Sequence, residues 1–481
     1  MELVRTEDAH RESLRRWVGF AIGFGLVLAY LLIRNEQQKP YDAWTYTELS
    51  QCFTRNGLFN FGAFAAQNAD CMRGYLFPWI LAACQGLAGL IPWLDYRLML
   101  STFVALTCAV ALPDLFGMLQ GLRGVSVWRR AAVPALVLLF WNGLLAYPLT
   151  DLWSAGFAIL AAYGLVSAFC QTDAPGWKRA CRMVLAGFSM GAAYNIRTVY
   201  LFLLPGFAVL YAGLCVARRE RAARHWLGWA GCLLAGFLAV SLPQMAINLQ
   251  AYGSPSFLLM SQSGSSLYIN KLYDGIYLDK YESYTGVDYG YEALYFIDPA
   301  GQEILEQEGL DESFQFGTGE AELGSIGAYL GLVLRHPLDF LGIYGRHSSS
   351  LLDVRYPNIY VDTLEGDAWT PLANYTLLYL CLLAAADAWR RRPQGKRLLP
   401  AVLGALLLPV LAAIPGAIEP RYGVLLYLVV WGGGLSLWEP RRLKGRSIAC
   451  AAVGYIAFIM LLCACNGAVE ASLLEYPLLY A

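Results

Sequence analysis

Long apolar stretches separated by short charged segments run along most of this sequence. Eleven of these stretches are candidate membrane spans: 17–33, 98–118, 131–147, 152–170, 181–195, 198–216, 226–247, 374–389, 398–415, 421–438 and 447–465. A transmembrane helix needs roughly 17–25 predominantly apolar residues. Stretches such as 399–415 are apolar on every side, whereas barrel strands would alternate with period two. The pattern therefore predicts a bundle of transmembrane helices.

The Lys and Arg residues predict how this bundle is oriented. Six short segments hold 23 of the 35 Lys and Arg residues: 1–16, 119–130, 171–182, 217–225, 390–397 and 439–446. Basic residues in short loops remain in the cytoplasm. We therefore expect a cytoplasmic N-terminus, an extracytoplasmic C-terminus and two long outer loops, 34–97 and 248–373. No small-residue cleavage site follows the first stretch, so we expect a retained helix rather than a signal peptide.

This orientation requires that the apolar stretch 74–92 does not cross the membrane. If it crossed, every later loop would change sides. The stretch contains Pro78 and ends at Pro92, which suits a re-entrant helix or one that lies on the membrane surface.

Together these features predict an all-α polytopic membrane protein. We expect about 11 transmembrane helices, additional re-entrant or juxtamembrane helices, and an extracytoplasmic loop domain. Three regions follow from the pattern: an N-terminal transmembrane catalytic module at 1–247, which includes the first outer loop, a loop region with amphipathic helices at 248–373, and C-terminal transmembrane helices at 374–481. Glycines 187 and 191 have the spacing typical of helix packing in membranes.

Composition agrees with a membrane location and excludes some functions. Hydrophobic residues make up 57% of the chain and charged residues only 15%, against about 25% charged in soluble proteins. A net charge of −1 argues against nucleic acid as a partner. The four histidines show no metal-ligand spacing, so we expect no zinc site. Cys52 and Cys71 share the first outer loop, where either a disulfide or two free thiols are compatible with the sequence.

Charged residues near the ends of the apolar stretches are the candidates for chemistry. Asp42 directly follows the first stretch, and Tyr46 lies one helical turn further on the same face. Such a helix could simply lie at the interface with aromatic anchors, or it could hold a carboxylate over a membrane-embedded site. Arg73 precedes an aromatic, proline-containing apolar stretch, where a snorkelling role is the simpler explanation.

Two further outer turns contain charged residues close to the membrane. Asp151 could cap the helix that follows it, and it lies at the same expected membrane level as Asp42. Arg197 stands in a tight hairpin between two apolar stretches. An Arg within a span costs about 2.5–3.5 kcal/mol on insertion scales, so it is expected to face a partner or a cavity.

The C-terminal half adds a smaller set of candidates. Glu419, Arg421 and Tyr422 form another tight outer turn, in which a local salt bridge would contribute at most ~1 kcal/mol. His336 and Pro337 begin an amphipathic helix. The loop 248–373 is rich in tyrosine, and we expect most of these tyrosines at the membrane interface rather than on a sugar.

In these residues the chain resembles the lipid-phosphosugar-dependent membrane glycosyltransferases of the GT-C superfamily. It is most similar to the branch with bacterial lipopolysaccharide-core transferases and protein O-mannosyltransferase-like enzymes. The resemblance covers nearly the whole layout. Its points of contact are Asp42 with Tyr46, Arg73 before Tyr75-Leu76-Phe77-Pro78, Asp151, Arg197, Arg421-Tyr422 and His336-Pro337. Ala43 replaces a Glu that is frequent in the family, and Gly74 and Tyr75 stand where prolines are common.

The resemblance implies inverting transfer of a sugar from a polyprenyl-phosphate carrier to an acceptor hydroxyl outside the cytoplasm. Because the leaving group is already a phosphate, one carboxylate acting as general base suffices, and we expect Asp42 in this role. Arginines 73, 197 and 421 are candidates for holding the donor phosphate. Asp151 would orient the acceptor or an arginine, and Tyr46, Glu419, Tyr422 and His336 are further candidate substrate contacts. We expect no cofactor, and the sequence leaves a divalent metal open.

Three other functions are compatible with parts of the pattern. A transporter or lipid flippase would have charges at mid-membrane and a path from both faces, whereas the charges here favour one face. A polysaccharide polymerase or ligase would use a lipid-diphosphate donor and arginine-rich outer loops. A scaffold would need no chemistry at all. The acceptor, whether glycan, lipid or protein, is not specified by any motif, and the cell membrane is the expected location.

Overall fold

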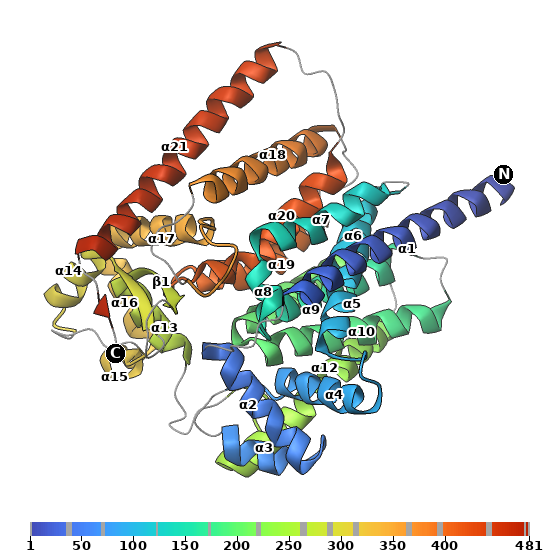
Figure 1. Ribbon diagram of the computed structural model, residues 1–481, viewed down its shortest axis with the longest axis horizontal. Coiled ribbons are helices and arrows are strands. Elements are labelled where there is room, and N and C mark those ends of the chain that lie inside the picture. Colours follow the sequence, from blue (N-terminus) through green and yellow to red (C-terminus); the bar gives the residue numbers. More distant parts are fainter. Residues whose placement is uncertain are drawn as a thin grey trace. The chain divides into compact units, whose positions relative to one another are not determined.

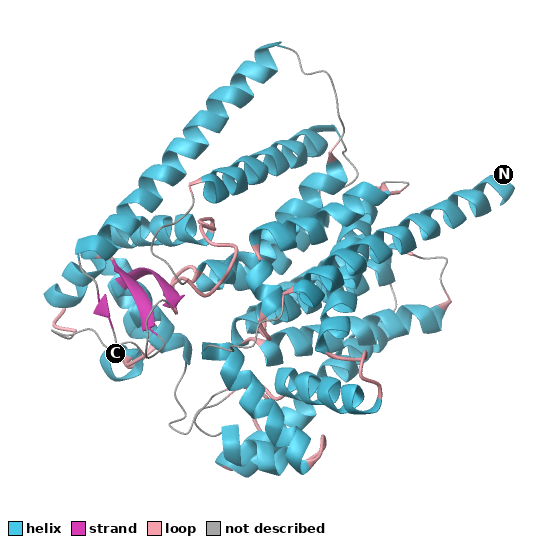
Figure 2. Ribbon diagram, viewed as in Figure 1, coloured by secondary structure: helices cyan, strands magenta, loops and turns pink. Residues whose placement is uncertain are grey.

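The computed structural model describes most of the chain. The described residues are 2–34, 41–68, 73–121, 124–171, 175–217, 223–259, 267–285, 292–310, 317–361, 368–391, 398–438, 445–475 and 478–479. Helices dominate these residues, and one small sheet accompanies them (Figure 2). Cys71 lies outside the described residues, so the proposed pairing with Cys52 stays a prediction.

The helices follow one another along the chain as Figure 1 labels them. In the first half they are α1 (Glu2–Ile33), α2 (Tyr41–Asn56), α3 (Phe61–Asn68), α4 (Leu76–Leu90), α5 (Tyr96–Val104), η1 (Ala105–Ala111), α6 (Leu112–Gln120), α7 (Val127–Phe140), α8 (Asn142–Ala146), α9 (Asp151–Cys170), α10 (Gly176–Ile196), η2 (Thr198–Phe202), α11 (Leu203–Ala217) and α12 (Ala223–Tyr252). In the second half they are α13 (Leu267–Tyr277), α14 (Pro299–Gln307), α15 (Gly319–Leu323), α16 (Ile326–Arg335), α17 (Pro337–Leu351), α18 (Trp369–Arg391), α19 (Leu398–Ala413), η4 (Pro420–Gly423), α20 (Val424–Leu437) and α21 (Gly445–Glu475).

Seven helices among the described residues are long and apolar enough to cross a membrane. They are His10–Ile33, Tyr96–Gln120, Asp151–Cys170, Thr198–Val216, His225–Tyr252, Trp369–Ala388 and Ser447–Leu473. The chain is thus a largely helical, polytopic membrane protein. All seven coincide with stretches expected from the sequence.

The four other expected spans are also helical but shorter or more polar. The stretch 131–147 is divided between α7 and α8. The stretch 181–195 belongs to α10, whose first half carries Lys178, Arg179 and Arg182. The stretches 398–415 and 421–438 correspond to α19 and α20, which have only 16 and 14 residues. A total of about eleven crossings, and the side of the membrane on which each loop lies, stay predictions. The stretch 74–92 forms α4, whose 15 residues rise about 22 Å, less than the ~30 Å hydrocarbon core.

The chain forms two compact units, each made of several segments, and the division into three functional regions stays a prediction. Unit 1 comprises residues 1–259, 381–409 and 425–439, and unit 2 comprises 260–380, 410–424 and 440–481. The expected C-terminal region 374–481 is shared because its helices have different packing partners. In α20, Gly432 lies against Leu112 of unit 1, whereas α21 packs on α17 and strand β2 of unit 2.

Unit 1 is built around α10, which packs on both α9 and α12 (Figure 1). The helices approach closely where small residues meet. A Cβ on Gly187 would lie 1.9 Å from the carbonyl oxygen of Leu233, so a larger residue would force α10 and α12 apart. This confirms the packing role expected for this glycine.

Unit 2 contains a sheet that the all-α prediction missed. Strands β1 (Leu278–Tyr284), β2 (Glu292–Ile297) and β3 (Leu478–Leu479) pair antiparallel in the order β1–β2–β3. Tyr281, Tyr284 and Tyr295, which we expected at the membrane interface, belong to these strands. Tyrosine favours strands because its ring packs well on a pleated surface.

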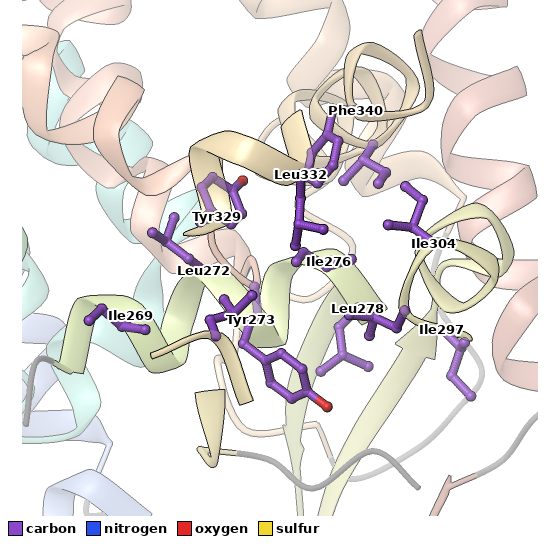
Figure 3. Packing of buried hydrophobic residues seen from close by; sticks show 14 of the residues in the cluster. Ile269, Leu272, Tyr273, Ile276, Leu278, Ile297, Ile304, Tyr329, Leu332 and Phe340 are labelled. Atoms are coloured by element: carbon purple, nitrogen blue, oxygen red, sulfur yellow. The ribbon is translucent and has the colours of Figure 1, made fainter. Parts of the chain in front are cut away.

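Helices α13, α14, α16 and α17 cover the sheet region of unit 2 and share a hydrophobic core with it. Leu272, Ile276, Tyr329, Leu332 and Phe340 are among the buried side chains of this cluster, and they point toward one another in Figure 3. The part of the expected loop region 248–373 that belongs to unit 2 therefore packs around a core of its own, to which Ala417 also contributes.

Candidate functional site

Helix α2 in unit 1 carries the first two candidates. Asp42 lies in its first turn, where the positive end of the helix dipole favours a carboxylate. The preceding residue, Tyr41, has a φ of 46°, a left-handed conformation that residues other than glycine adopt rarely. Backbone strain of this kind is often found at functional sites. Tyr46, one turn later, is buried.

Arg73 pairs with Asp42. Its Nη2 lies 2.6 Å from Asp42 Oδ1, and the side chains are 37% and 25% exposed, respectively. The guanidinium also lies over the ring of Tyr46, with 5.5 Å between Cζ and the ring centroid, within the range of a cation–π interaction. The structure thus places three predicted residues from two segments together.

A second pair joins the N-terminus of α9 to the C-terminal end of α10. Arg197 is the residue at which α10 ends, and its Nη1 donates to Oδ1 of Asp151, which opens α9. Asp151 is almost fully buried and Arg197 is 18% exposed. The pair thus sits at one end of α9, which is one of the seven candidate spans.

Tyr46 connects the two pairs. Its side chain lies close to that of Thr150, which directly precedes Asp151. Burial raises the pKa of Tyr46, and the charges of Arg73 and, to a smaller extent, Arg197 act against this rise. The structure therefore brings Asp42, Tyr46, Arg73, Asp151 and Arg197 into one group. We call it the outer cluster, after the side of the membrane on which the sequence predicts it.

Two asparagines that the sequence analysis missed hold the outer cluster in place. Asn68 donates from Nδ2 to the carbonyl oxygen of Arg73 at 2.7 Å and accepts from the amide of Arg73 at 3.3 Å. Asn195 accepts from the amide of Leu76 at 2.9 Å and donates to Gln244 Oε1 at 3.0 Å. Both asparagines are buried. The sequence indicated a role for Asn195 only through its position, as a polar residue at the end of an apolar stretch.

Gly74 shows why the segment after Arg73 departs from the proline-rich pattern of the resembling family. A Cβ at this position would lie 1.7 Å from the carbonyl oxygen of Asn195. The backbones of the two arginine-bearing segments therefore touch at Gly74 and Asn195, one residue after Arg73 and two before Arg197.

The remaining candidates belong to unit 2. Arg421 Nε lies 2.8 Å from Glu419 Oε2, and both side chains are largely buried. The hydroxyls of Tyr422 and Tyr281 hydrogen-bond to each other. His336 lies at the start of α17 with its Nε2 2.9 Å from Glu308 Oε1, an arrangement that fixes the turn between α16 and α17. A substrate role for these four residues stays a prediction.

Metal-ligating side chains do not gather in the part of the chain that the structure describes. No group of three or more His, Cys, Asp or Glu residues there could hold a metal ion. The outer cluster itself offers two carboxylates, each already paired with a guanidinium. Of the two, the more exposed Asp42–Arg73 pair can exchange its carboxylate for a phosphate, since both bind arginine through the same kind of charged hydrogen bonds.

Comparisons with known proteins add little to this description. No family model matches the sequence, and no curated protein matches it. Among solved structures the chain is similar to the archaeal oligosaccharyltransferase AglB from Archaeoglobus fulgidus, which was solved in complex with an inhibitory peptide and a dolichol-phosphate. The identity is 11% and the TM-score 0.43, over 96% of this chain and 56% of AglB. The chain thus spans little more than half the length of that protein, and a likeness of this size carries no argument about function.

Proposed function

We propose that this protein is an inverting membrane glycosyltransferase of the GT-C type. In this proposal it transfers a sugar from a polyprenyl-phosphate carrier to an acceptor hydroxyl at the extracytoplasmic face of the cell membrane. The observation that carries the proposal is the outer cluster: two carboxylates and two guanidiniums meet around Tyr46 at the ends of helices in a membrane protein.

Asp42 is the general base of the proposed reaction. The acceptor oxygen attacks the anomeric carbon of the sugar, and its proton passes to a carboxylate oxygen of Asp42. The bond between the anomeric carbon and the phosphate oxygen breaks, and polyprenyl phosphate leaves with both electrons. A positioned general base contributes about 10²–10⁴-fold to such a step. A single displacement inverts the configuration at the anomeric carbon.

The arginines bind the donor phosphate and stabilise the charge that it gains. In the structure Arg73 occupies Oδ1 of Asp42, the oxygen atom that a hydrogen bond to the acceptor could otherwise use. A donor phosphate that competes for Arg73 would loosen this pair and free Asp42 for the acceptor. Asp151 is the more buried acid and acts by orienting Arg197. Arg421, Glu419, Tyr422 and His336, which belong to unit 2, stay candidate substrate contacts in the proposal.

The surroundings of the outer cluster suit a lipid-linked donor. Trp44 on α2, two residues after Asp42, is exposed. Exposed aromatic and apolar side chains of this kind are typical of the membrane interface. A polyprenyl chain could then remain in the lipid while its phosphate reaches the arginines. Since the leaving group is a phosphate, the reaction requires no organic cofactor.

The proposal is tested in a strain that lacks the gene and is complemented with variants. Asp42→Asn keeps the size of the side chain but removes the base, so we expect sugar transfer to fall by about 10²–10⁴-fold at normal protein levels. Mass spectrometry of surface glycans should show loss of the product, and the polyprenyl-phosphate sugar should accumulate in lipid extracts. Glu48→Gln makes the same chemical change on another face of α2 and should be active.

Two outcomes would overturn the proposal. A fully active Asp42→Asn protein would exclude Asp42 as the base. Accumulation of a lipid-diphosphate oligosaccharide instead of a lipid-phosphate sugar would identify a polymerase or ligase.

A further inference from the structure

Helices α16 and α17 of unit 2 are apolar on two opposite faces. One face packs into the core of the unit through Tyr329, Leu332 and Phe340, which are at most 3% exposed (Figure 3). The other face is exposed. Its side chains, which we call the leucine face, are Ile326 at 44%, Leu330 at 53%, Leu334 at 81%, Leu338 at 80% and Leu341 at 68% exposure.

The leucine face is continuous across the turn between the two helices. Residues 326, 330 and 334 follow one another at the i, i+4 spacing that places side chains on the same face of a helix, and Leu338 and Leu341 follow at the start of α17. Arg335 and His336 fix the turn itself. Arg335 Nη2 lies 2.6 Å from Glu308 Oε2, and His336 Nε2 lies 2.9 Å from Glu308 Oε1. Leu334 and Leu338, the two most exposed side chains of the leucine face, thus lie on either side of a turn that Glu308 fixes by its contacts with Arg335 and His336.

The lengths of these helices limit what can cover the leucine face. With 10 and 15 residues, α16 and α17 are about 15 and 22 Å long, too short to cross a ~30 Å hydrocarbon core. A helix that is apolar on every side is normally buried in protein or in lipid, and α16 contains no charged residue before Arg335.

Helix α17 is attached to a spanning helix that faces lipid. Ser349 Oγ donates to Asn466 Oδ1 of α21 at 2.7 Å. Helix α21 contains the candidate span Ser447–Leu473, and only 6% of its most apolar window is buried. In a membrane protein the exposed part of this span lies in lipid. Because Asn466 is near the C-terminal end of the span, α17 is held close to the level where the hydrocarbon core ends.

We propose that the leucine face is embedded in the surface of the lipid bilayer and anchors unit 2 there. The partner is the acyl-chain region of one leaflet, which accepts apolar side chains without any specific contact. The turn with Arg335 and His336 lies at the level of the headgroups, where charged side chains are solvated. This anchor is separate from the proposed transfer reaction and does not depend on it.

Photo-cross-linking in the full-length protein tests this anchor. Benzoylphenylalanine replaces Leu338 in one variant and Leu341 in a second, and each protein is irradiated in native membranes and analysed by mass spectrometry. Glu303 on α14 of the same unit is exposed and polar, and it serves as the matched position for a third variant. We expect roughly tenfold more lipid adduct at positions 338 and 341 than at 303, because only the former meet acyl chains.

The other possible products each contradict the proposal. A cross-link to a second copy of this chain or to another protein would show that protein covers the leucine face. Adduct levels equal to those of the Glu303 variant would show that water does. The use of two positions keeps the test informative if one variant folds poorly, and thermal unfolding of each purified variant identifies such a failure.

Discussion

Charged residues pair in both units, but the pairs differ in how far their side chains are buried from solvent. In unit 2, Lys280 is 1% exposed, with Nζ 2.9 Å from Glu282 Oε1 and 2.7 Å from Glu470 Oε1. In the same unit Arg346 bridges the buried acids Asp279 and Asp298. Each of these networks contains a fully buried charge, although Glu470 and Arg346 are 28% and 26% exposed. In the outer cluster of unit 1, Asp151 is likewise buried, whereas both members of the Asp42–Arg73 pair are open to solvent, at 25% and 37% exposure.

The difference separates charges that serve the fold from charges that are open to a ligand. Burial, and then the neighbouring carboxyl of Asp298, raise the pKa of Asp279, while Arg346 acts in the opposite direction. Burial would lower the pKa of Lys280, but Glu282 and Glu470 together raise it above its usual value. These charges depend on one another, and a ligand could not take one without leaving another buried and uncompensated. The Asp42–Arg73 pair can exchange a partner because solvent already reaches it.

The comparison predicts first that Lys280→Met destabilises the protein strongly. Methionine has a similar length and removes only the charge, which leaves Glu282 and Glu470 facing each other. Removal of one partner from a buried charge network typically costs about 3–5 kcal/mol. Thermal unfolding in detergent, followed by the loss of the monodisperse peak in size-exclusion chromatography, measures this effect.

An exposed ion pair provides the control for Lys280. Arg97 Nε lies 2.5 Å from Asp95 Oδ2, and the two side chains are 47% and 23% exposed. Arg97→Gln should change stability by no more than ~1 kcal/mol. If Lys280→Met were as stable as Arg97→Gln, the network of Lys280, Glu282 and Glu470 would not stabilise the fold. The two units would then not differ in the role of their ion pairs.

The outer cluster was largely accessible from the sequence because its charged residues stand at the ends of apolar stretches. Asp42, Arg73, Asp151 and Arg197 each follow or precede such a stretch, so topology alone predicts that they share a membrane level. The residues that position them were not accessible. Asn195 bonds the amide of Leu76, 119 positions away, and nothing local to either residue indicates this contact.

The fold of unit 2 was less predictable for a related reason. Its strands pair β1 with β2 and β2 with the chain's end at Leu478 and Leu479, a pairing over about 180 residues that no short-range pattern encodes. In the sequence, the tyrosines of β1 and β2 were as compatible with a position at the membrane interface as with a strand. Periodicity predicted the helices well because each one is a local structure, whereas sheet pairing depends on distant segments.

A smaller effect is expected from Gly74→Ala, which disturbs the outer cluster without altering its charges. The added Cβ would lie 1.7 Å from the carbonyl oxygen of Asn195, so the segments that carry Arg73 and Arg197 must separate. Misplacement of a catalytic group by 1 Å can reduce the rate by about 10²-fold. We expect a loss of this order in the rate of sugar transfer, measured in reconstituted membranes with the lipid-phosphate sugar that accumulates in the deletion strain.

Gly86→Ala is the matched control for Gly74. It makes the same substitution in the adjoining helix α4, where a Cβ meets nothing within 4 Å, and it should leave activity unchanged. Equal activity of the two alanine variants would show that sugar transfer does not need the close contact between Gly74 and Asn195. The relative positions of Arg73 and Arg197 would then not matter for the reaction.

The smallest effect is expected from Tyr46→Phe, which tests whether the two pairs of the outer cluster act as one site. Phenylalanine keeps the ring beneath Arg73 and its edge-on contact with Phe77, at 5.1 Å between centroids, but it removes the hydroxyl, which lies close to the side chain of Thr150. Loss of a polar interaction of this kind costs at most about 1 kcal/mol, or roughly a fivefold lower kcat/KM. Tyr329→Phe in the core of unit 2 removes a comparable hydroxyl, bonded to Tyr344 at 2.7 Å, and should change stability but not kcat/KM. If Tyr46→Phe behaved like Tyr329→Phe, the tyrosine would only support the fold. The pairs Asp42–Arg73 and Asp151–Arg197 would then have to be treated as independent ion pairs.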